Sequence, residues 1–375
     1  MRAQVLEAYN EPYRLHEVPR HNSPQGQDLL IKVQAASYCH TDAVLAAGLR
    51  PTNLPRVGSH EIAGVIEEIG PQVDPSRGFK INTRVGVPAR TYHSCGTCSE
   101  CQHPEADSPG YSIFCEKSQG VGLDVDGGFQ DYCLVDSRQC VVIPDSLSAV
   151  DTAPLMCAGL TIWNALLRAG VPLKENGGAN RKIAILGAGG GLGHLGVQFA
   201  AKLGCKVVAV DASDKPLQLL RNVVDRLGPD GKQVMVVDAR SQKVEEIRTK
   251  VNEGSGSSVN QGVDASIVLP ENQLAFNYAM KLLGNHGTCV VVSFPEDGFK
   301  VDAKDLVYRD IRLMGSLCGR IQQLQEMIDF TVKHGIKSET RVYSLENVND
   351  LVADYHAGVG GKLVVDLTLS APTTT

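Results

Sequence analysis

Short apolar runs alternate with helical patterns from about residue 153 onward. Runs rich in Val and Ile are typical of strands buried on both faces, as in a parallel sheet covered by helices. Between the first two runs, apolar residues from Leu192 to Leu203 recur with the spacing of one helix face. This order predicts a doubly wound α/β sheet. The runs lie at 183–186, 207–210, 234–237, 265–268 and 289–292, and a sixth at 311–314 extends the sheet.

The first 155 residues have a different pattern of apolar and polar positions. Short β segments such as 29–33 and 64–69 are interrupted by Gly, Pro and polar clusters, which predicts a β-rich domain. The last 50 residues are mixed and end in a strand at 362–367, whose natural partner is the β-rich first part. We therefore expect a discontinuous β-rich domain of residues 1–156 and 320–375, and an α/β domain of residues 157–319.

Composition narrows the class of protein. The 375 residues are 43% hydrophobic and 21% charged, which is ordinary for a folded protein, and the net charge of −6 argues against a broad nucleic-acid surface. No apolar run is long enough to span a membrane, and the charged N-terminus does not resemble a secretion signal, so we expect a cytoplasmic protein. The 11 cysteines then favour metal ligation or free thiols over disulfides.

A glycine-rich segment follows the first buried strand. Such a turn lets the backbone approach a pyrophosphate, and the next helix directs its N-terminal N–H groups at it. The literal G-x-G-x-x-G match begins at Gly191, but the strand end suggests that the tight turn begins at Gly187. Candidate nucleotide contacts are Gly187, Gly189, Gly190, Gly191, Leu192 and Gly193. A loop that merely permits close helix packing is the alternative.

Asp211 closes the next strand, 20 residues after Gly191. A carboxylate at this point can accept hydrogen bonds from an adenosine ribose, and it would repel a 2′-phosphate. NAD is therefore favoured over NADP. The competing interpretation is that Asp211 only caps a helix.

Four cysteines lie close together in one segment of the sequence. Cys95, Cys98 and Cys101 are each separated by two residues and are followed by Cys115. Four thiolates satisfy a tetrahedral zinc ion completely, so this lobe, about residues 93–116, is predicted to hold a structural zinc. A redox-active C-x-x-C or unpaired thiols are the alternatives.

Three further groups are individually unremarkable: the segment Cys39-His40-Thr41-Asp42, the segment Gly58-Ser59-His60-Glu61, and Cys157 in an apolar run. Together with the four-cysteine lobe, Asp126-Gly127-Gly128-Phe129 and the glycine loop, they occur in an order that resembles the zinc-dependent medium-chain alcohol dehydrogenase family, nearest its yeast-like and bacterial branch. The similarity covers essentially the whole chain.

The resemblance implies a Rossmann cofactor domain over 157–319 and a GroES-like catalytic zinc domain over 1–156 and 320–375. It also implies two zinc ions per chain. Cys39, His60 and Cys157 would hold the catalytic zinc, with Glu61 behind the metal as an occasional ligand. Asp42 would orient His60, and Thr41 would hydrogen-bond the substrate oxygen.

The resemblance also assigns contacts to a nicotinamide cofactor. His40 matches a pyrophosphate contact, Thr161 a nicotinamide contact, and Lys215 a ribose contact one residue closer to Asp211 than usual. Lys362 lies near a basic residue that meets the pyrophosphate in relatives. Members of the family pair through the edge of the cofactor sheet, here near 312–318, as dimers or tetramers.

The implied activity is hydride transfer between NAD(H) and a primary or secondary alcohol, or the matching aldehyde or ketone. Where relatives place an aromatic residue, this chain has Arg90 and Thr91, which favours a bulkier or anionic substrate unless Arg90 points to solvent. A polyol dehydrogenase and a non-catalytic NAD-binding redox sensor are the alternatives. Cys157 argues against the first, because such relatives tend to use a carboxylate there.

Overall fold

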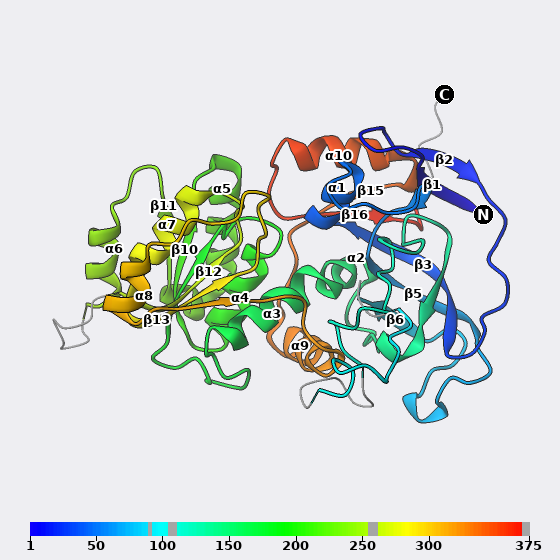
Figure 1. Ribbon diagram of the computed structural model, residues 1–375, viewed down its shortest axis with the longest axis horizontal. Coiled ribbons are helices and arrows are strands. Elements are labelled where there is room, and N and C mark those ends of the chain that lie inside the picture. Colours follow the sequence, from blue (N-terminus) through cyan, green and yellow to red (C-terminus); the bar gives the residue numbers. More distant parts are fainter. Residues whose placement is uncertain (89–91, 104–110, 254–261, 370–375) are drawn as a thin grey trace. The chain divides into compact units, whose positions relative to one another are not determined.

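The structure, a computed structural model, describes residues 1–88, 92–103, 111–253 and 262–369 (Figure 1). The chain forms two compact units. Unit 1 contains Met1–Leu160, Cys318–Ala357 and the segment from Lys362 onward, and unit 2 contains Thr161–Leu317 and Gly358–Gly361. Four short crossings of the chain thus connect two separately packed bodies.

Unit 2 is built on a six-stranded parallel sheet with the order β11-β10-β9-β12-β13-β14. The first strand in sequence lies inside the sheet, and the chain builds outward from it in both directions. This confirms the predicted doubly wound sheet. The strands are β9 (Lys182–Leu186), β10 (Lys206–Asp211), β11 (Val234–Asp238), β12 (Val263–Val268), β13 (Leu283–Val291) and β14 (Arg312–Gly315).

Helices cover both faces of this sheet because its strands are apolar on both sides. On one face, Ile185 of β9 lies against Gly196 of α4, and Trp163 of α3 packs edge-on against Phe199 with ring centroids 5.1 Å apart. On the other face, Ala184 and Leu186 join a core built with helices α6 and α7. The helices are α3 (Ala158–Arg168), α4 (Gly193–Lys202), α5 (Asp214–Arg226), α6 (Val244–Val251), α7 (Gln273–Leu282) and α8 (Ala303–Arg309).

Unit 1 is β-rich, as predicted, and contains two sheets. The larger has the order β15-β16-β3-β5-β6-β8, with β7 also paired to β3; the smaller has the order β2-β1-β4. The strands are β1 (Arg2–Leu6), β2 (Arg14–Glu17), β3 (Asp28–Tyr38), β4 (Arg56–Val57), β5 (Glu61–Ile69), β6 (Arg84–Val87), β7 (Tyr132–Asp136), β8 (Val141–Val142), β15 (Thr340–Tyr343) and β16 (Lys362–Asp366).

The C-terminal strand β16 pairs antiparallel with β3, with Val365 opposite Ala36. The last part of the chain therefore completes the sheet begun by the first part, as the sequence predicts. Strand β5 approaches β3 closely at Gly64, where a Cβ atom would lie 2.4 Å from the Lys32 carbonyl oxygen. Any other residue at position 64 would push the two strands apart.

Short helices complete unit 1: α1 (His40–Ala46), α2 (Ala149–Thr152), α9 (Ile321–His334) and α10 (Val348–His356), with 3-10 turns η1 (Pro75–Arg77), η2 (Ser137–Gln139), η3 (Ala153–Met156) and η5 (Leu345–Asn347). Within the described residues, no single helix has the length and apolar character that crossing a membrane requires. The pair Ala149–Met156 and Ala158–Arg168, bent by 46°, meets the length and composition criterion together.

Candidate active site and metal centres

The four cysteines of the lobe converge on one point. The Sγ atom of Cys115 lies 3.6 Å from that of Cys95 and 3.8 Å from that of Cys98. Backbone N–H groups point at the same sulfurs: Cys98 N lies 3.3 Å from Cys95 Sγ, and Cys101 N lies 3.4 Å from Cys98 Sγ. All eleven cysteines of the chain are free thiols, so no disulfide explains this convergence.

These distances suit a zinc ion. Four sulfurs at the usual Zn–S distance of about 2.3 Å form a tetrahedron with edges of about 3.8 Å. The N–H···S bonds favour the thiolate form, and hydrogen bonds from Thr97 and Cys98 lower the pKa of Cys95 to about 5. Cys95 is therefore deprotonated at neutral pH, whereas burial raises the pKa of Cys101 to about 11, so that metal binding would release a proton from Cys101. Four sulfurs in this geometry leave no open coordination position.

A second cluster lies inside unit 1 and joins Cys39, His60, Glu61 and Cys157. One potential ligand atom from each residue lies within 4.8 Å of all the others. Cys39 precedes α1, His60 and Glu61 lie at the start of β5, and Cys157 follows η3. Segments up to 118 residues apart in sequence therefore meet here. Sulfur and imidazole are preferred zinc ligands, so this donor set also fits zinc.

Glycines allow these segments to meet. Gly86 of β6 faces Met156, and a Cβ atom at residue 86 would lie 2.4 Å from the Met156 sulfur. The absence of a side chain lets η3, and with it Cys157, lie directly on the sheet. Similarly, a Cβ atom at Gly127 would lie 2.0 Å from the Ser59 carbonyl oxygen. The conformation of the residues just before His60 therefore depends on Gly127.

Asp42 ties two of the candidate ligands together. Its Oδ2 accepts a hydrogen bond from Cys39 N (2.9 Å), which caps α1, and its Oδ1 lies 3.0 Å from His60 Nδ1. Ser59 N donates to the same Oδ1 at 3.2 Å. The carboxylate is 1% exposed. Because Nδ1 of His60 is occupied by Asp42, Nε2 is the nitrogen available to a metal.

Glu61 is held by a buried lysine. Its Oε2 lies 2.5 Å from Lys362 Nζ, and its Oε1 accepts a hydrogen bond from Ala158 N at 3.0 Å. Lys362 is 4% exposed and also donates to the Tyr38 carbonyl oxygen at 2.8 Å. Burial raises the pKa of Glu61 to about 7, although the lysine charge acts in the opposite direction. The ammonium group of Lys362 is thus engaged by the carboxylate beside the metal cluster.

The thiol groups of this second cluster are protonated when no cation is present. The hydrogen bond with Cys157, followed by burial, raises the pKa of Cys39 to about 12. Burial alone would lower the pKa of His60, but the Asp42 carboxylate raises it well above its ordinary value. A bound cation would reverse this balance, because metal ligation requires thiolate and neutral imidazole.

Two other predicted site residues lie on α1 next to this cluster. Thr41 is half-buried, directly after His40 at the helix start. His40 Nδ1 lies 2.7 Å from the hydroxyl of Tyr355 on α10. The tyrosine was not predicted from the sequence, because nothing in the spacing of residues 40 and 355 links them.

In unit 2, the glycine loop begins where β9 ends. Gly187 has a left-handed backbone with φ of 76°, and its N–H group donates to Val210 O at 2.9 Å. The tight turn therefore starts at Gly187, and α4 begins at Gly193. A Cβ atom at Gly193 would lie 2.2 Å from Gly187 O, and one at Gly189 would lie 2.3 Å from Pro216 O. The backbone is packed too closely here for any side chain.

Asp211 ends β10 beside this loop. Its Oδ2 accepts a hydrogen bond from Gly189 N at 3.0 Å, and its Oδ1 accepts from Ala212 N at 2.8 Å. The helix that follows, α5, has Ser213 at its N-cap, so Asp211 fixes the glycine loop instead of capping a helix. Lys215 is exposed on the first turn of α5, and Thr161 is buried at the start of unit 2.

Comparison with known proteins identifies the family. Residues 25–145 match the alcohol dehydrogenase GroES-like domain, and residues 191–333 match the zinc-binding dehydrogenase domain. An alcohol dehydrogenase of Geobacillus stearothermophilus is 34% identical over 97% of this chain and 99% of its own length. Alcohol dehydrogenase 1 of Emericella nidulans is 30% identical over 97% of each chain. The chain belongs to the zinc-dependent medium-chain alcohol dehydrogenase family.

Solved structures agree with this membership. The alcohol dehydrogenase of Aeropyrum pernix superposes with a TM-score of 0.81 at 26% identity and covers 98% of this chain and 100% of its own. An acetophenone reductase of Geotrichum candidum superposes with a TM-score of 0.78 at 24% identity over 97% of this chain and 96% of its own. At 24% identity, the likeness to the acetophenone reductase shows a shared fold only.

Two features of this family member were missed by sequence reasoning. Cys318, expected to be a small core residue, is buried and hydrogen-bonds with Cys157, which makes it a further sulfur beside the metal cluster. The segment Gly358–Gly361 returns to unit 2, where Gly361 N donates to Gly189 O at 3.3 Å. The run Gly-Val-Gly-Gly was the available signal for the second. Arg90 and Thr91 lie outside the described residues.

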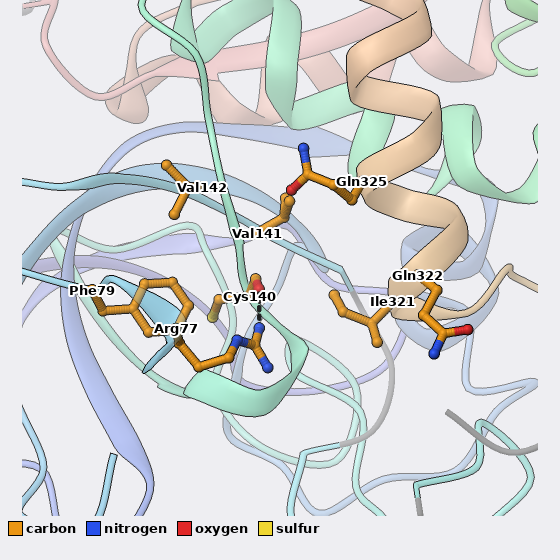
Figure 2. Close-up of a pocket in the computed structure, with 8 residues that line it drawn as sticks. All are labelled: Arg77, Phe79, Cys140, Val141, Val142, Ile321, Gln322 and Gln325. Carbon is orange, nitrogen blue, oxygen red and sulfur yellow. Dashed lines mark hydrogen bonds between the residues drawn. The ribbon is translucent and has the colours of Figure 1, made fainter. Parts of the chain in front are cut away.

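A surface cavity of about 260 Å³ in unit 1 lies apart from these residues (Figure 2). Its walls come from the end of η1 and the segment after it, from Cys140 and β8, and from the start of α9. Arg77 reaches into it, but its guanidinium donates to the carbonyl oxygens of Cys140 (2.8 Å) and Arg138 (3.3 Å) and lies over the ring of Phe79. None of the lining residues belongs to either metal cluster, so this cavity is not a candidate for the active site.

Proposed function

We propose that the chain is a zinc-dependent dehydrogenase that uses NAD(H) to interconvert alcohols with aldehydes or ketones. The convergence of Cys39, His60 and Cys157 on one point, with Glu61 beside them, carries the proposal. A site with three sulfur or nitrogen ligands leaves one coordination position for a substrate oxygen, which is the arrangement of catalytic zinc. The lobe cysteines would hold a second, structural zinc.

Zinc held by Cys39, His60 and Cys157 would supply a Lewis acid for the substrate oxygen, and nicotinamide bound along the glycine loop would supply or take up the hydride. The protein's contribution is orientation. Asp42 fixes the ring of His60 through Nδ1 and, by capping α1, fixes the backbone of Cys39. Thr41 follows on the same helix, and we assign its hydroxyl to hydrogen-bond the substrate oxygen.

Glu61 and Lys362 tune the charge behind the metal. Two thiolates and one carboxylate place three negative charges around a dication, and the buried ammonium of Lys362 offsets the surplus. We therefore propose that Lys362 acts mainly on Glu61. The pyrophosphate contact predicted for it from the resemblance would require its amine to leave this ion pair. His40 remains the residue on α1 proposed to meet the pyrophosphate.

The cofactor would bind along the glycine loop of unit 2. The close packing at Gly189 and Gly193 excludes side chains from the loop, as a backbone that approaches a pyrophosphate closely requires. Asp211 lies beside the loop with a carboxylate that would accept ribose hydroxyls and repel a 2′-phosphate. This supports NAD over NADP. Thr161 and Lys215 are proposed contacts to nicotinamide and ribose.

Self-association through β14 is also proposed. This strand is the edge of the six-stranded sheet, and Leu313 on it is 41% exposed. An exposed sheet edge offers unpaired N–H and C=O groups that a second copy can satisfy. We expect a dimer built on this edge, as in relatives, or a tetramer of such dimers.

The test is NADH oxidation against a panel of aldehydes and ketones, from acetaldehyde to bulky aromatic and carboxylate-bearing carbonyls. We expect turnover that is lost after zinc chelation, restored by added zinc, and slower with NADPH. An Arg90→Ala variant should raise KM for a carboxylate-bearing substrate more than for a neutral one. Absence of turnover with any carbonyl, despite bound zinc and NADH, would favour a non-catalytic redox sensor.

A further inference from the structure

A second cavity, which is polar, lies in unit 2 at the opposite end of the sheet from the glycine loop. It has a volume of about 400 Å³ and is lined by the starts of β9, β12 and β14, by the turn within β13 and by the end of α3. The glycine loop follows the other end of β9. Strand residues advance about 3.3 Å each, so Lys182 and Gly187 are about 16 Å apart. The cavity is therefore separate from the proposed dinucleotide site.

Positive charge dominates the walls of this cavity. Arg168, Arg181, Lys182 and Arg312 line it, together with His286, whereas Asp264 is the one carboxylate among the described lining residues. The net charge of the whole chain is −6, so a random surface would carry more acids than bases. Four fixed cations around one concave surface raise the local concentration of anions.

Hydrogen bonds to uncharged acceptors hold three of these cations in place. Arg168 donates to Gly315 O at 3.1 Å, Arg181 to Gly170 O at 3.0 Å, and Lys182 to the side-chain oxygen of Asn252 at 2.6 Å. All three acceptors are uncharged. Within the described parts of the chain, none of the four cations has a carboxylate within 4.0 Å. Each guanidinium also keeps further N–H donors, because it has five.

Asp264 offsets only one of these four positive charges. Its carboxylate accepts a hydrogen bond from the backbone N–H of Lys182 at 2.8 Å, which fixes it at the start of β12. Asp310 on the exposed rim pairs with His286 at 2.9 Å and also interacts electrostatically with Arg312. Glycines at positions 170, 262, 284 and 287 carry no side chain into the cavity, so a ligand can approach the backbone.

We propose that this cavity binds a small molecule bearing a diphosphate group. Four cations less the Asp264 carboxylate leave a lining charge of +3, which matches the three to four negative charges of a diphosphate better than the two of a single phosphate. Guanidinium groups bind phosphate oxygens through two parallel N–H···O bonds. The volume lies within the range of small-molecule sites. The ligand would bind at the opposite end of the strands from the cofactor and independently of it.

The experiment is calorimetric titration of the full chain with inorganic pyrophosphate in 0.1 M salt, with saturating NAD present to fill the cofactor site. The test variant is Arg168→Gln with Arg181→Gln. The matched control is Lys232→Gln with Lys250→Gln, which removes the same charge from exposed positions of unit 2 outside the cavity. NADH binding, measured by fluorescence in every variant, reports whether unit 2 is folded.

We expect pyrophosphate to bind with a Kd below about 1 mM, at least tenfold more weakly in the test variant and within twofold of wild type in the control. No binding by the wild type, or equal weakening in both variants, would overturn the proposal. So would a test variant that changes only the oligomeric state, because the cations would then serve a contact between copies. If NAD itself fails to bind, the proposed dehydrogenase function is in doubt, but the comparison of the two variants still tests this cavity.

Discussion

The two clusters of potential metal ligands in unit 1 are assembled in opposite ways. The four lobe cysteines lie within 21 residues of sequence, and backbone N–H groups of the same loop point at their sulfurs. The second cluster draws its ligands from α1, β5 and the turn after η3, and side chains far away in sequence hold them. A local cluster can form from the loop alone, whereas the second cluster needs the whole unit to be folded.

We also expect the two clusters to have different roles, one in stability and the other in catalysis. A closed set of four thiolates can only pin a loop, because no coordination position is left for substrate. A set of three ligands with a carboxylate behind them keeps a position open. We therefore expect damage to the second cluster to remove activity with the fold intact, and damage to the lobe to lower stability first.

The largest effect is expected for Cys157→Ser. Loss of one thiolate from the open site should remove one zinc per chain and lower kcat/KM by about a thousandfold or more, since a Lewis acid contributes several kcal/mol to the transition state. Zinc content by mass spectrometry and steady-state kinetics measure this. Cys205→Ser, a buried cysteine of unit 2, is the control. Retained zinc with full activity would contradict the assignment.

Cys98→Ser should act mainly on stability. It opens the four-thiolate site, and a loss of a few kcal/mol would lower Tm by about 5–10 °C. Activity measured well below Tm should fall less than tenfold. A thousandfold loss of activity at unchanged Tm would reverse the roles that we assign to the two clusters.

The next largest effect is expected for Lys362→Met. It leaves the carboxylate of Glu61 buried without a charged partner, which costs about 3–5 kcal/mol while that group is ionised. Burial already raises the pKa of Glu61 to about 7, so the folded state binds a proton more tightly than the unfolded state does. Folding stability should therefore fall as pH rises from 6 to 8.

Chemical denaturation of the Lys362→Met variant at pH 6 and pH 8 measures this effect. Lys362→Arg keeps the charge and should lose much less stability. Equal losses for Met and Arg at both pH values would show that packing, not charge, is the role of this residue.

Asp42→Asn should have an intermediate effect on the open site only. The amide of Asn keeps the shape of the carboxylate but makes a weaker hydrogen bond with His60 Nδ1. Replacing the hydrogen-bond partner of a metal-binding histidine typically lowers metal affinity or activity by about 10–100-fold. Competition with a chromogenic zinc chelator measures the affinity. The lobe zinc should stay unchanged, which provides an internal control, and loss of both ions together would indicate general unfolding.

The smallest effect should appear in thiol labelling of the chelated protein. Backbone hydrogen bonds lower the pKa of Cys95 to about 5, whereas contact with Cys157 and burial raise that of Cys39 to about 12. Iodoacetamide should therefore modify Cys95 at a nearly constant rate from pH 6 to pH 8, because its thiolate is already formed. Cys39 should remain unmodified. Peptide mass spectrometry resolves the two, and the opposite preference would contradict the contrast between the clusters.

Much of unit 2 could be predicted because its signals are local. Buried parallel strands appear as continuous Val/Ile runs, and the predicted runs at 183–186, 207–210 and 234–237 fall within β9, β10 and β11. Strand β13 begins at Leu283, six residues before the predicted run, because its first half is a polar turn with His286 at positive φ. Apolar periodicity cannot detect such a segment.

Pairings between distant residues could not be predicted. The expected role for Lys362 came from resemblance, but its ion pair with Glu61 depends on β16 lying beside β3 and β3 beside β5. Likewise, Cys318 meets Cys157 only because the chain returns to unit 1 at residue 318. No spacing in the sequence encodes either contact.

The sequence by itself determined the α/β class of unit 2, the β-rich character of unit 1, the glycine loop and the four-cysteine lobe, because each depends on residues close together in the chain. The tertiary structure alone decided that Glu61 faces a buried ammonium group, that Asp42 joins Cys39 to His60, and that four cations gather at one end of the parallel sheet. These features depend on which strands become neighbours, and burial then fixes their charges and hydrogen bonds at distances that local sequence cannot specify.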